Sequence, residues 1–322
     1  MSSPRVIDVP ALVESARAGS ARAVGRLVSL VEDAHPALRE VMAALAPHTG
    51  EAWVIGLTGA PGVGKSTSTT ALVRAFRARG SRIGVLAIDP SSPFSGGALL
   101  GDRIRMSEHS TDPGVFIRSM ASRGHLGGLS WATPQAIRVL DAAGCDVVLV
   151  ETVGVGQSEV EVAGLADTSV VLLAPGMGDG IQAAKAGILE IGDVFVVNKA
   201  DRDGADATVH DLRHMISLAD RTAPGLWRPP VLKTVAVQAD GIDAVMDALD
   251  RHRTFITSTG ELRRRRERRA ADEIEWIALA TLRSRLSQVG GHTGVDGLSS
   301  RVADGSLDPY AAADLLISHI DR

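Results

Sequence analysis

The sequence predicts an α/β protein: a doubly wound, mostly parallel sheet with helical extensions at both ends of the chain. Three observations support this fold class. Short runs of valine, isoleucine and leucine alternate with amphipathic stretches from residue 53 to about residue 255. These runs are almost continuously apolar, as expected for parallel strands buried on both faces. The segments before and after them have the apolar spacing of helices.

Length and composition are those of a globular protein. The 322 residues are 45% hydrophobic, which is enough for a packed core in one large domain or two smaller ones. A formal net charge of -4 does not favour nucleic acid or a membrane surface as a partner, and no apolar run is long enough to span a bilayer. Cys145 is the only cysteine, which excludes an internal disulfide and favours a cytoplasmic location.

Residues 1–50 are expected to form a helical extension, because apolar residues such as Leu27, Val28 and Val31 recur there at helical spacing. Residues 51–258 are expected to form the domain that contains the sheet. Its predicted strands are residues 53–58, 82–88, 115–120, 146–150, 168–173, 194–197 and 231–234.

A glycine-rich loop follows the first predicted strand. Residues 59–66 have the sequence GAPGVGKS, which matches the phosphate-binding pattern G-x-x-x-x-G-K-S/T, and a predicted helix follows. In this arrangement backbone N–H groups surround phosphate oxygens, Lys65 contacts the β- and γ-phosphates, and the Ser66 hydroxyl binds Mg²⁺. The sequence therefore predicts a nucleotide site. Its expected contact residues are Gly59, Ala60, Pro61, Gly62, Val63, Gly64, Lys65, Ser66 and Thr67.

The tetrapeptide Asn198-Lys199-Ala200-Asp201 follows the sixth predicted strand and matches N-K-x-D. Asp201 can accept hydrogen bonds from N1–H and the N2 amino group of guanine, which adenine cannot supply, while Asn198 faces the opposite ring edge and the Lys199 stem covers the base. Alone, the tetrapeptide is also compatible with a polar turn. Together with the phosphate-binding loop it predicts GTP and GDP as ligands.

Acidic residues bound the glycine- and serine-rich segment between these two motifs. Asp89 ends a predicted strand and Asp102 closes the loop that follows, so both could approach the Mg²⁺ held by Ser66, or could simply cap helices. Glu151 and Gly154 stand where many GTPases have D-x-x-G. We expect Glu151 to act on Mg²⁺ or its water shell, and Gly154 to donate its N–H to the γ-phosphate. Gln157 is a candidate for orienting the attacking water, or a surface residue.

Residues 259–322 are expected to form a helical C-terminal segment that mediates dimerisation. An arginine-rich run at residues 261–269 precedes apolar residues at helical spacing, among them Ile274, Ile277 and Leu282. The run could bind an acidic partner, but the solvated face of a long helix is the favoured interpretation. The apolar residues could pack on the same chain or on a second subunit.

The combined motifs resemble the MeaB/ArgK family of P-loop GTPases of the SIMIBI class, the G-protein chaperones associated with methylmalonyl-CoA mutase. Beside the motifs above, the resemblance is carried by residues 89–92 (DPSS), 101–103 (GDR), 123–128 (RGHLGG) and 151–157 (ETVGVGQ). It implies a homodimeric GTPase whose turnover gates the loading of adenosylcobalamin into the mutase, the release of damaged cofactor and so the protection of the mutase. We expect hydrolysis to be slow alone and stimulated by the partner. The resemblance also implies metal contacts from Ser66, Asp102 and Glu151, with Asp89 close by.

A third loop is implied by the resemblance, at residues 176–185. Gln182 and Lys185 match positions that move toward the nucleotide in relatives when the mutase docks. Gly180 and Ile181 depart from the usual acid and leucine at the preceding positions. For Lys185 the alternative is a helix-surface lysine, and for His125 in the RGHLGG segment a tight turn is favoured over metal or phosphate binding.

Three other functions remain open. A nickel-type metallochaperone GTPase would need cysteine and histidine ligands at a dimer face, which one cysteine and scattered histidines do not favour. A kinase of periplasmic amino-acid-transport proteins would need a pocket for a phosphate acceptor. A scaffold that does not hydrolyse GTP is disfavoured by the presence of both Lys65 and Gly154. Which cobalamin-dependent mutase is served does not follow from the sequence.

Overall fold

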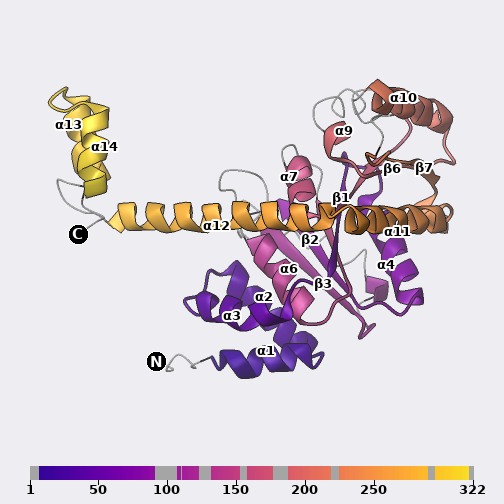
Figure 1. Ribbon diagram of the computed structural model, residues 1–322, viewed down its shortest axis with the longest axis horizontal. Coiled ribbons are helices and arrows are strands. Elements are labelled where there is room, and N and C mark those ends of the chain that lie inside the picture. The colour runs from indigo at the N-terminus through magenta and orange to yellow at the C-terminus, as the bar shows by residue number, and fades with distance from the viewer. Residues whose placement is uncertain are drawn as a thin grey trace. The chain divides into compact units, whose positions relative to one another are not determined.

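Seven parallel strands form the central sheet, which confirms the predicted fold class (Figure 1). The computed structural model describes residues 7–90, 107–109, 111–122, 132–152, 158–176, 188–218, 225–288 and 294–318. The strands are β1 (Trp53–Thr58), β2 (Ile83–Pro90), β3 (Val115–Ser122), β4 (Val147–Thr152), β5 (Thr168–Leu173), β6 (Val194–Asn198) and β7 (Val231–Thr234). All seven correspond to predicted strands, and β1, β5 and β7 have the predicted bounds.

The strand order is β3-β2-β4-β1-β5-β6-β7. Strands β1 and β5 are neighbours in the sheet. After β1 the chain continues to β2 on one side of this pair, whereas after β5 it continues to β6 on the other side. In open parallel sheets such a reversal opens a crevice beyond the carboxyl ends of the strands, where ligands bind. The phosphate-binding loop follows β1 and therefore begins at this crevice.

Helices α4 (Lys65–Ala78) and α11 (Ile242–Ser258) cover one face of the sheet. Alternate residues of β1, beginning with Trp53 and Ile55, point to this face and are buried against α4. The Trp53 and Phe76 rings pack edge to face with centroids 6.1 Å apart. This packing fixes α4, and with it the loop that precedes α4, on the sheet.

The N-terminal helices and two crossover helices share a hydrophobic cluster with the opposite face. Gly56 of β1 allows a close approach there, because a Cβ at this position would collide with Val162. The N-terminal segment is thus packed against the sheet, and it is helical as predicted. The helices are α1 (Val9–Arg17), α2 (Ala21–Glu32), α3 (Leu38–Leu45), α6 (Ala132–Ala142) and α7 (Ser158–Leu165).

Helix α10 (Ala205–Leu218) covers this opposite face of the sheet over β5, β6 and β7. It buries Val209 and Leu212 against these strands. A short helix, α9 (Ile188–Ile191), precedes β6. Three 3₁₀ turns lie at Ala46–His48, Ser107–His109 and Ala236–Gln238. The last of these connects β7 to α11, next to the end of β6.

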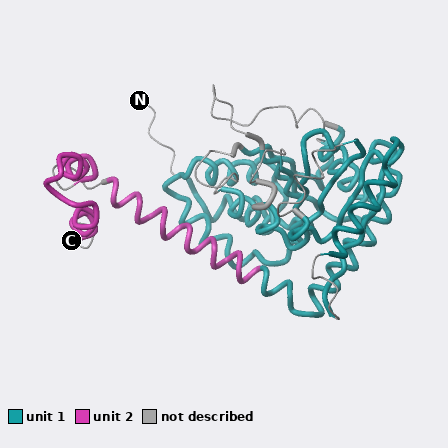
Figure 2. Tube along the Cα trace, turned by 90° about the horizontal axis from the view of Figure 1, so that it is seen from above, with its two compact units in different colours: residues 1–265 teal, residues 266–322 magenta. Residues whose placement is uncertain are grey.

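The chain divides into two compact units, residues 1–265 and residues 266–322 (Figure 2). The second unit contains most of α12 (Glu261–Gln288), followed by α13 (Val295–Ala303) and α14 (Pro309–Ser318). Apolar side chains of α12, including Ile274, Ile277 and Leu282, are exposed. The predicted role of residues 259–322 in dimerisation stays a prediction.

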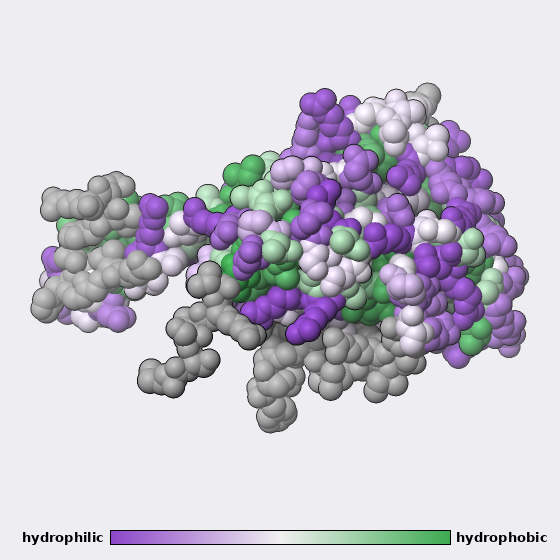
Figure 3. All heavy atoms as spheres, turned by 90° about the horizontal axis from the view of Figure 1, so that it is seen from below, coloured by the Kyte–Doolittle hydropathy of each residue, from purple (hydrophilic) through white to green (hydrophobic). Residues whose placement is uncertain are grey.

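On the face drawn in Figure 3, hydrophobic residues are scattered among hydrophilic ones. Among the described residues, none of the helices combines the length and the apolar character needed to cross a bilayer.

Candidate functional site

The phosphate-binding loop turns sharply because three of its glycines have positive φ angles: 143° at Gly59, 80° at Gly62 and 96° at Gly64. Two of them also lie too close to neighbouring segments for any side chain. A Cβ on Gly59 would collide with the Leu172 carbonyl oxygen, and one on Gly64 with the Asn198 amide nitrogen. The glycines are therefore needed both for the backbone conformation and for the close contacts of the loop.

Helix α4 begins directly after the loop, and its N-cap is Gly64. Glycine has no side chain that could cap the helix, so the positive end of the helix dipole is not screened by its own cap residue. A helix of 14 residues with this start favours an anion beside its first turn.

The Lys65 side chain is buried and folds back over the loop. Its Nζ donates hydrogen bonds to the carbonyl oxygens of Gly59, at 2.5 Å, and Ala60, at 3.1 Å. The ammonium group is therefore held against the loop backbone. Its predicted contact with phosphates stays a prediction.

Glu151 is the next-to-last residue of β4, beside β1, where its backbone is in register with Leu57. Glu151 is 2% exposed, and its carboxylate accepts a hydrogen bond from Ser66 Oγ, at 2.7 Å on Oε1. Thr69 Oγ1 lies 2.8 Å from the other oxygen, Oε2. The structure thus brings together two predicted metal-site residues, Ser66 and Glu151, and adds Thr69.

Two further hydroxyl groups are buried at the same edge of the sheet. Thr58 ends β1 and Thr152 ends β4, and both side chains are fully buried. Within the described residues neither hydroxyl has a hydrogen-bond partner. Buried hydroxyl groups usually have a hydrogen-bond partner. These two could therefore still form hydrogen bonds next to the loop.

Asn198 joins the loop to the segment after β7. Its Nδ2 donates to the Val63 carbonyl oxygen at 2.8 Å, and its Oδ1 accepts from Thr234 Oγ1 at 3.2 Å and from the Ala236 N–H at 3.1 Å. The side chain is 3% exposed. Among the described residues, these contacts use one of the two amide hydrogens of Asn198.

Lys199 lies over the phosphate-binding loop, and its Nζ donates to the Gly62 carbonyl oxygen at 2.6 Å. Its backbone φ of 57° is unusual for a residue other than glycine. Asp201 is exposed in the turn after β6, and the turn is held by a hydrogen bond from the Ala200 N–H to the Thr234 carbonyl oxygen at 3.0 Å. Asn198 and Lys199 therefore contact the loop directly, and Asp201 lies in the turn that follows them.

Several predicted residues cannot be placed. The backbone of Asp89 belongs to the last part of β2, in register with Ala121 of β3, but its side chain lies outside the described residues. The residues wholly outside the described ranges are Asp102, His125, Gly154, Gln157, Gln182 and Lys185. In the part of the chain that the structure describes, no three histidine, cysteine, aspartate or glutamate residues are grouped so that they could hold a metal ion.

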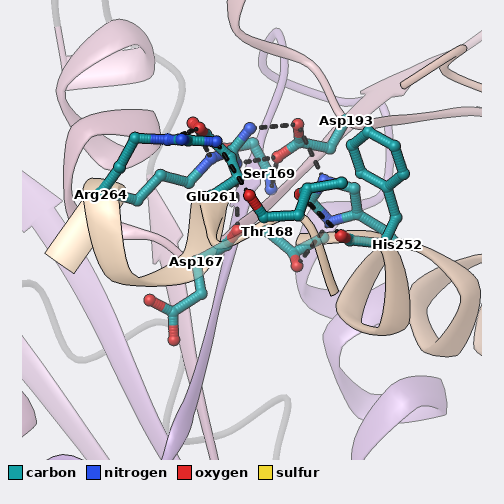
Figure 4. A network of polar contacts seen from close by, with 10 residues as sticks. Asp167, Thr168, Ser169, Asp193, His252, Glu261 and Arg264 are labelled. Atoms are coloured by element: carbon teal, nitrogen blue, oxygen red, sulfur yellow. Dashed lines mark hydrogen bonds and ion pairs between the residues drawn. The ribbon is translucent and has the colours of Figure 1, made fainter. Parts of the chain in front are cut away.

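A second polar cluster lies at the opposite ends of β5 and β6 (Figure 4). Thr168 Oγ1 is 2.9 Å from His252 Nδ1, and His252 Nε2 is 3.2 Å from Asp193 Oδ1. Although a hydroxyl, an imidazole and a carboxylate are aligned, Thr168 and His252 are both fully buried. Trp53 Nε1 also donates to Thr168 Oγ1 at 3.0 Å. A substrate has no access to this cluster, which is therefore structural.

Asp193 in this cluster is held as a carboxylate. Burial alone would raise its pKa, but hydrogen bonds from His252 and Arg265 lower the pKa to about 2. Arg265 donates to both carboxylate oxygens, at 2.8 and 3.0 Å, and Ser169 N–H donates to Oδ2 at 2.9 Å. Arg265 belongs to the arginine run that we expected to be solvated, so the expectation does not hold for this member.

Three residues of the site, Thr69, Thr234 and Ala236, were not predicted from the sequence. Thr69 lies three residues after Ser66, which puts both on the same face of α4, so helix spacing was a usable signal. Thr234 is in register with Asn198 in the paired strands β6 and β7, but that pairing follows only from the strand order. No local sequence pattern indicated that the backbone N–H of Ala236 contacts Asn198.

Comparisons with known proteins agree with these features. Residues 24–290 match the family model described as methylmalonyl-CoA mutase-associated GTPase MeaB. A protein of Pyrococcus abyssi whose name describes it as a GTPase is 48% identical over 310 residues, which are 96% of either chain. The mitochondrial methylmalonic aciduria type A homolog of Mus musculus is 36% identical over 269 residues, 82% of this chain and 64% of that protein. A crystal structure of LAO/AO transport system kinase aligns over both whole chains with 28% identity and a TM-score of 0.72.

Proposed function

Because this chain belongs to the MeaB family of methylmalonyl-CoA mutase-associated GTPases, we propose that it is a GTP-hydrolysing chaperone of a cobalamin enzyme. In this proposal, GTP binding and hydrolysis gate the loading of adenosylcobalamin into methylmalonyl-CoA mutase or a related acyl-CoA mutase, and protect that enzyme. The family description and the name of the mouse relative support the choice of partner.

The observation that carries the proposal is the contact of Ser66 with Glu151 at the start of α4. Because Ser66 gives its proton to Glu151, its oxygen lone pairs can face a cation on the other side. The hydroxyl and the carboxylate are hard oxygen ligands of the kind that Mg²⁺ prefers. The glycine cap of α4 and the ammonium group of Lys65 fit the phosphates of the same ligand. The residues present therefore fit a nucleotide with Mg²⁺.

Hydrolysis would proceed by attack of water on the γ-phosphate of GTP. Lys65 would exchange its contacts with the Gly59 and Ala60 carbonyls for contacts with the β- and γ-phosphates, where it stabilises charge in a loose transition state. Glu151 and Ser66 would hold Mg²⁺, which when bound neutralises charge on the phosphate oxygens. Asp102 and Asp89 would lie close to the same ion.

Two further residues would complete the chemistry after β4. The Gly154 N–H would donate to the γ-phosphate, and Gln157 would orient the attacking water. Asp201 would accept from the N1 and N2 hydrogens of guanine, Asn198 would use its remaining amide hydrogen on the base, and the Lys199 stem would cover the ring. The exposed position of Asp201 leaves its carboxylate available for this role.

Regulation by the partner would depend on the third loop. Gln182 and Lys185 would move toward the nucleotide when the mutase docks, so that the slow intrinsic rate rises. We further propose that residues 259–322 join two copies into a homodimer, and that the protein acts in the cytoplasm.

The direct test is GTP hydrolysis by the wild-type protein and the Lys185→Ala variant, each with and without the mutase. We expect stimulation of the wild type and loss of stimulation in the variant. Lys233→Ala is the matched control, since Lys233 pairs with Asp206 on the surface and should not affect stimulation. Unchanged stimulation of Lys185→Ala would remove Lys185 from the mechanism, and no stimulation of the wild type would refute the coupling to the mutase.

A kinase is the second candidate, because one aligned crystal structure is that of a transport system kinase. A kinase would transfer the γ-phosphate to a protein acceptor, whereas a hydrolase releases it as inorganic phosphate. Incubation of γ-labelled GTP with candidate acceptors distinguishes the two. Label recovered on an acceptor would favour the kinase.

A nickel-type metallochaperone receives no support from the described residues, which hold no group of three or more potential nickel ligands of the histidine, cysteine or carboxylate type. Metal analysis of the purified protein tests this alternative. Nickel bound in stoichiometric amount would favour it over the mutase chaperone.

A further inference from the structure

We propose that Thr69 is a positioning residue that fixes the carboxylate of Glu151 for its role toward Mg²⁺. This inference rests on the proposed function, and it concerns a residue outside the phosphate-binding motif. Thr69 lies on the first turns of α4, and its side chain is fully buried.

Two hydroxyl groups hold the carboxylate of Glu151, one at each oxygen. Ser66 Oγ is 2.7 Å from Oε1 of Glu151, and Thr69 Oγ1 is 2.8 Å from Oε2. Both hydroxyls project from the same face of one helix, because residues three apart in an α-helix are neighbours. A carboxylate held at one oxygen can still rotate about its last bond, whereas one held at both oxygens has its plane fixed.

The length of glutamate makes this arrangement possible. Glu151 stands at the end of β4, where many related sites have an aspartate, which is one methylene shorter. The extra methylene carries the carboxylate over Ser66 far enough to reach Thr69, one helical turn further on. Because Glu151 is only 2% exposed, water cannot easily replace a lost hydrogen-bond partner of its carboxylate.

A purely structural explanation of Thr69 also exists. Its Oγ1 is 3.0 Å from the Lys65 carbonyl oxygen, four residues earlier, which is a common contact of threonine within helices. A hydroxyl has one proton and cannot donate fully to both acceptors. The carboxylate is nearer and charged, so it is the stronger acceptor. The Thr69 hydroxyl therefore donates to Glu151.

The consequence concerns metal-dependent nucleotide binding. Ser66 and Glu151 together would orient the cation, and a carboxylate free to rotate would present its oxygens less well. Loss of an outer partner of a metal site typically weakens metal binding about 10- to 100-fold. Nucleotide binding without the metal depends on the loop and Lys65, and should not need Thr69.

The test measures the affinity for a fluorescent GDP analogue with excess Mg²⁺ and with EDTA, together with the Mg²⁺ concentration that restores tight binding. Thr69→Val replaces the hydroxyl by a methyl group of similar size. We expect EDTA affinity like that of the wild type, but a Mg²⁺ requirement raised about 10- to 100-fold. Ser68→Ala is the matched control: it removes a buried hydroxyl of the same helix that has no partner among the described residues, and should change neither value.

A double-mutant cycle distinguishes a role of Thr69 through its contact with Glu151 from a role through its contact within the helix. The carboxylate in Glu151→Asp is too short to contact both hydroxyls, so adding Thr69→Val to this variant should raise the Mg²⁺ requirement no further. The same fold-change in both backgrounds would mean that Thr69 acts through the helix, and would overturn the proposal. Thr69→Ser retains the hydroxyl and should bind Mg²⁺-GDP nearly as the wild type does.

Separate controls test whether each variant is folded and whether the wild type binds nucleotide as the proposed function requires. Thermal unfolding of each variant without nucleotide shows whether it is folded, and Thr69→Ala replaces Thr69→Val if the valine variant is not. A wild-type protein that binds no GDP would refute the proposed function. A wild type with Mg²⁺-enhanced binding and a folded Thr69 variant with the same Mg²⁺ requirement would refute only the role of Thr69.

Discussion

At the scale of single residues, the nucleotide site depends on a few positions that no other residue type can fill. Gly64 is the clearest case, because it combines a φ of 96° with a contact to Asn198 that leaves no space for a Cβ. Lys65, Ser66 and Glu151 then carry the polar groups. The spacing of the loop motif predicts Gly64, Lys65 and Ser66, and the position of Glu151 before Gly154 predicts its role toward Mg²⁺. The direct contact of Ser66 with Glu151 was not predicted.

Gly64→Ala should abolish nucleotide binding, because the new methyl group displaces Asn198 and the loop it supports. Backbone strain at positive φ should also lower the free energy of unfolding by about 1–2 kcal/mol. Gly80→Ala is the control: φ is 82° there, but no atom lies within 4 Å of the Cβ position. We expect the control to lose stability in urea unfolding and to bind fluorescent GDP normally. Normal GDP binding by Gly64→Ala would contradict the described geometry.

Asp201→Asn should change the preferred base. The new amide has a single acceptor oxygen, so it cannot accept from both the N1 and N2 hydrogens of guanine, and GTP binding should weaken about 10- to 100-fold. Xanthosine triphosphate has an oxygen at position 2, which can accept from the amide, and should bind more tightly than GTP. Competition titrations of the two nucleotides measure the change. A variant that keeps its preference for GTP would show that Asp201 does not contact the base.

At the scale of elements, sequence patterns predicted the strands, which depend on local burial. They missed side-chain contacts between residues that are far apart in the sequence. The strands were predictable because both faces are covered, which makes each strand a continuous apolar run. Helix spacing places Thr69 on the same face as Ser66, but Thr69 was missed because its partner Glu151 is 82 residues away in the sequence. Arg265 was missed because its partner Asp193 is 72 residues away, and the surrounding arginines suggested a solvated face.

The contact of Arg265 with Asp193 joins the start of α12 to β6 and should make stability depend on pH. The folded-state pKa of Asp193, about 2, lies below the ordinary value of 3.8. The stabilisation is therefore complete above about pH 4 and is lost as the pH falls toward 2. Urea unfolding between pH 2 and pH 7 should show this decline in the wild type.

Arg265→Gln tests the same contact at neutral pH. We expect a loss of about 1–3 kcal/mol, because Asp193 is buried and loses two hydrogen bonds. The neighbour Arg264 is exposed and forms its ion pair with Glu261 on the same helix, so Arg264→Gln should change the unfolding free energy by less than about 0.5 kcal/mol. Equal effects of the two substitutions would contradict the importance of the buried pair.

At the scale of the whole molecule, a GTPase unit is followed by a C-terminal unit whose longest helix exposes apolar side chains. Exposed fractions of 68% at Ile274, 40% at Ile277 and 45% at Leu282 are unusual for a helix that has no further role. The helical spacing of these residues was visible in the sequence. Whether their partner is the same chain or a second copy was not, because both would bury the same stripe.

We predict that the double substitution Ile274→Glu and Ile277→Glu converts a dimer into a monomer, because charges on the apolar face of α12 disfavour its burial. Sedimentation velocity measures the change in mass, and GDP binding should be unaffected. Ser284→Glu introduces charge at an exposed polar position of the same helix and should leave the dimer intact. A wild type that is already monomeric would refute the role of residues 259–322 in dimerisation.

The central claim is that a guanine nucleotide binds in the loop between β1 and α4. Isothermal titration calorimetry of the purified protein with GDP, GTP and ATP tests it most directly. We predict saturable heat with either guanine nucleotide at one site per chain, little or none with ATP, and its loss in Lys65→Ala. No heat with GDP and GTP, or equal binding of ATP, would contradict the claim.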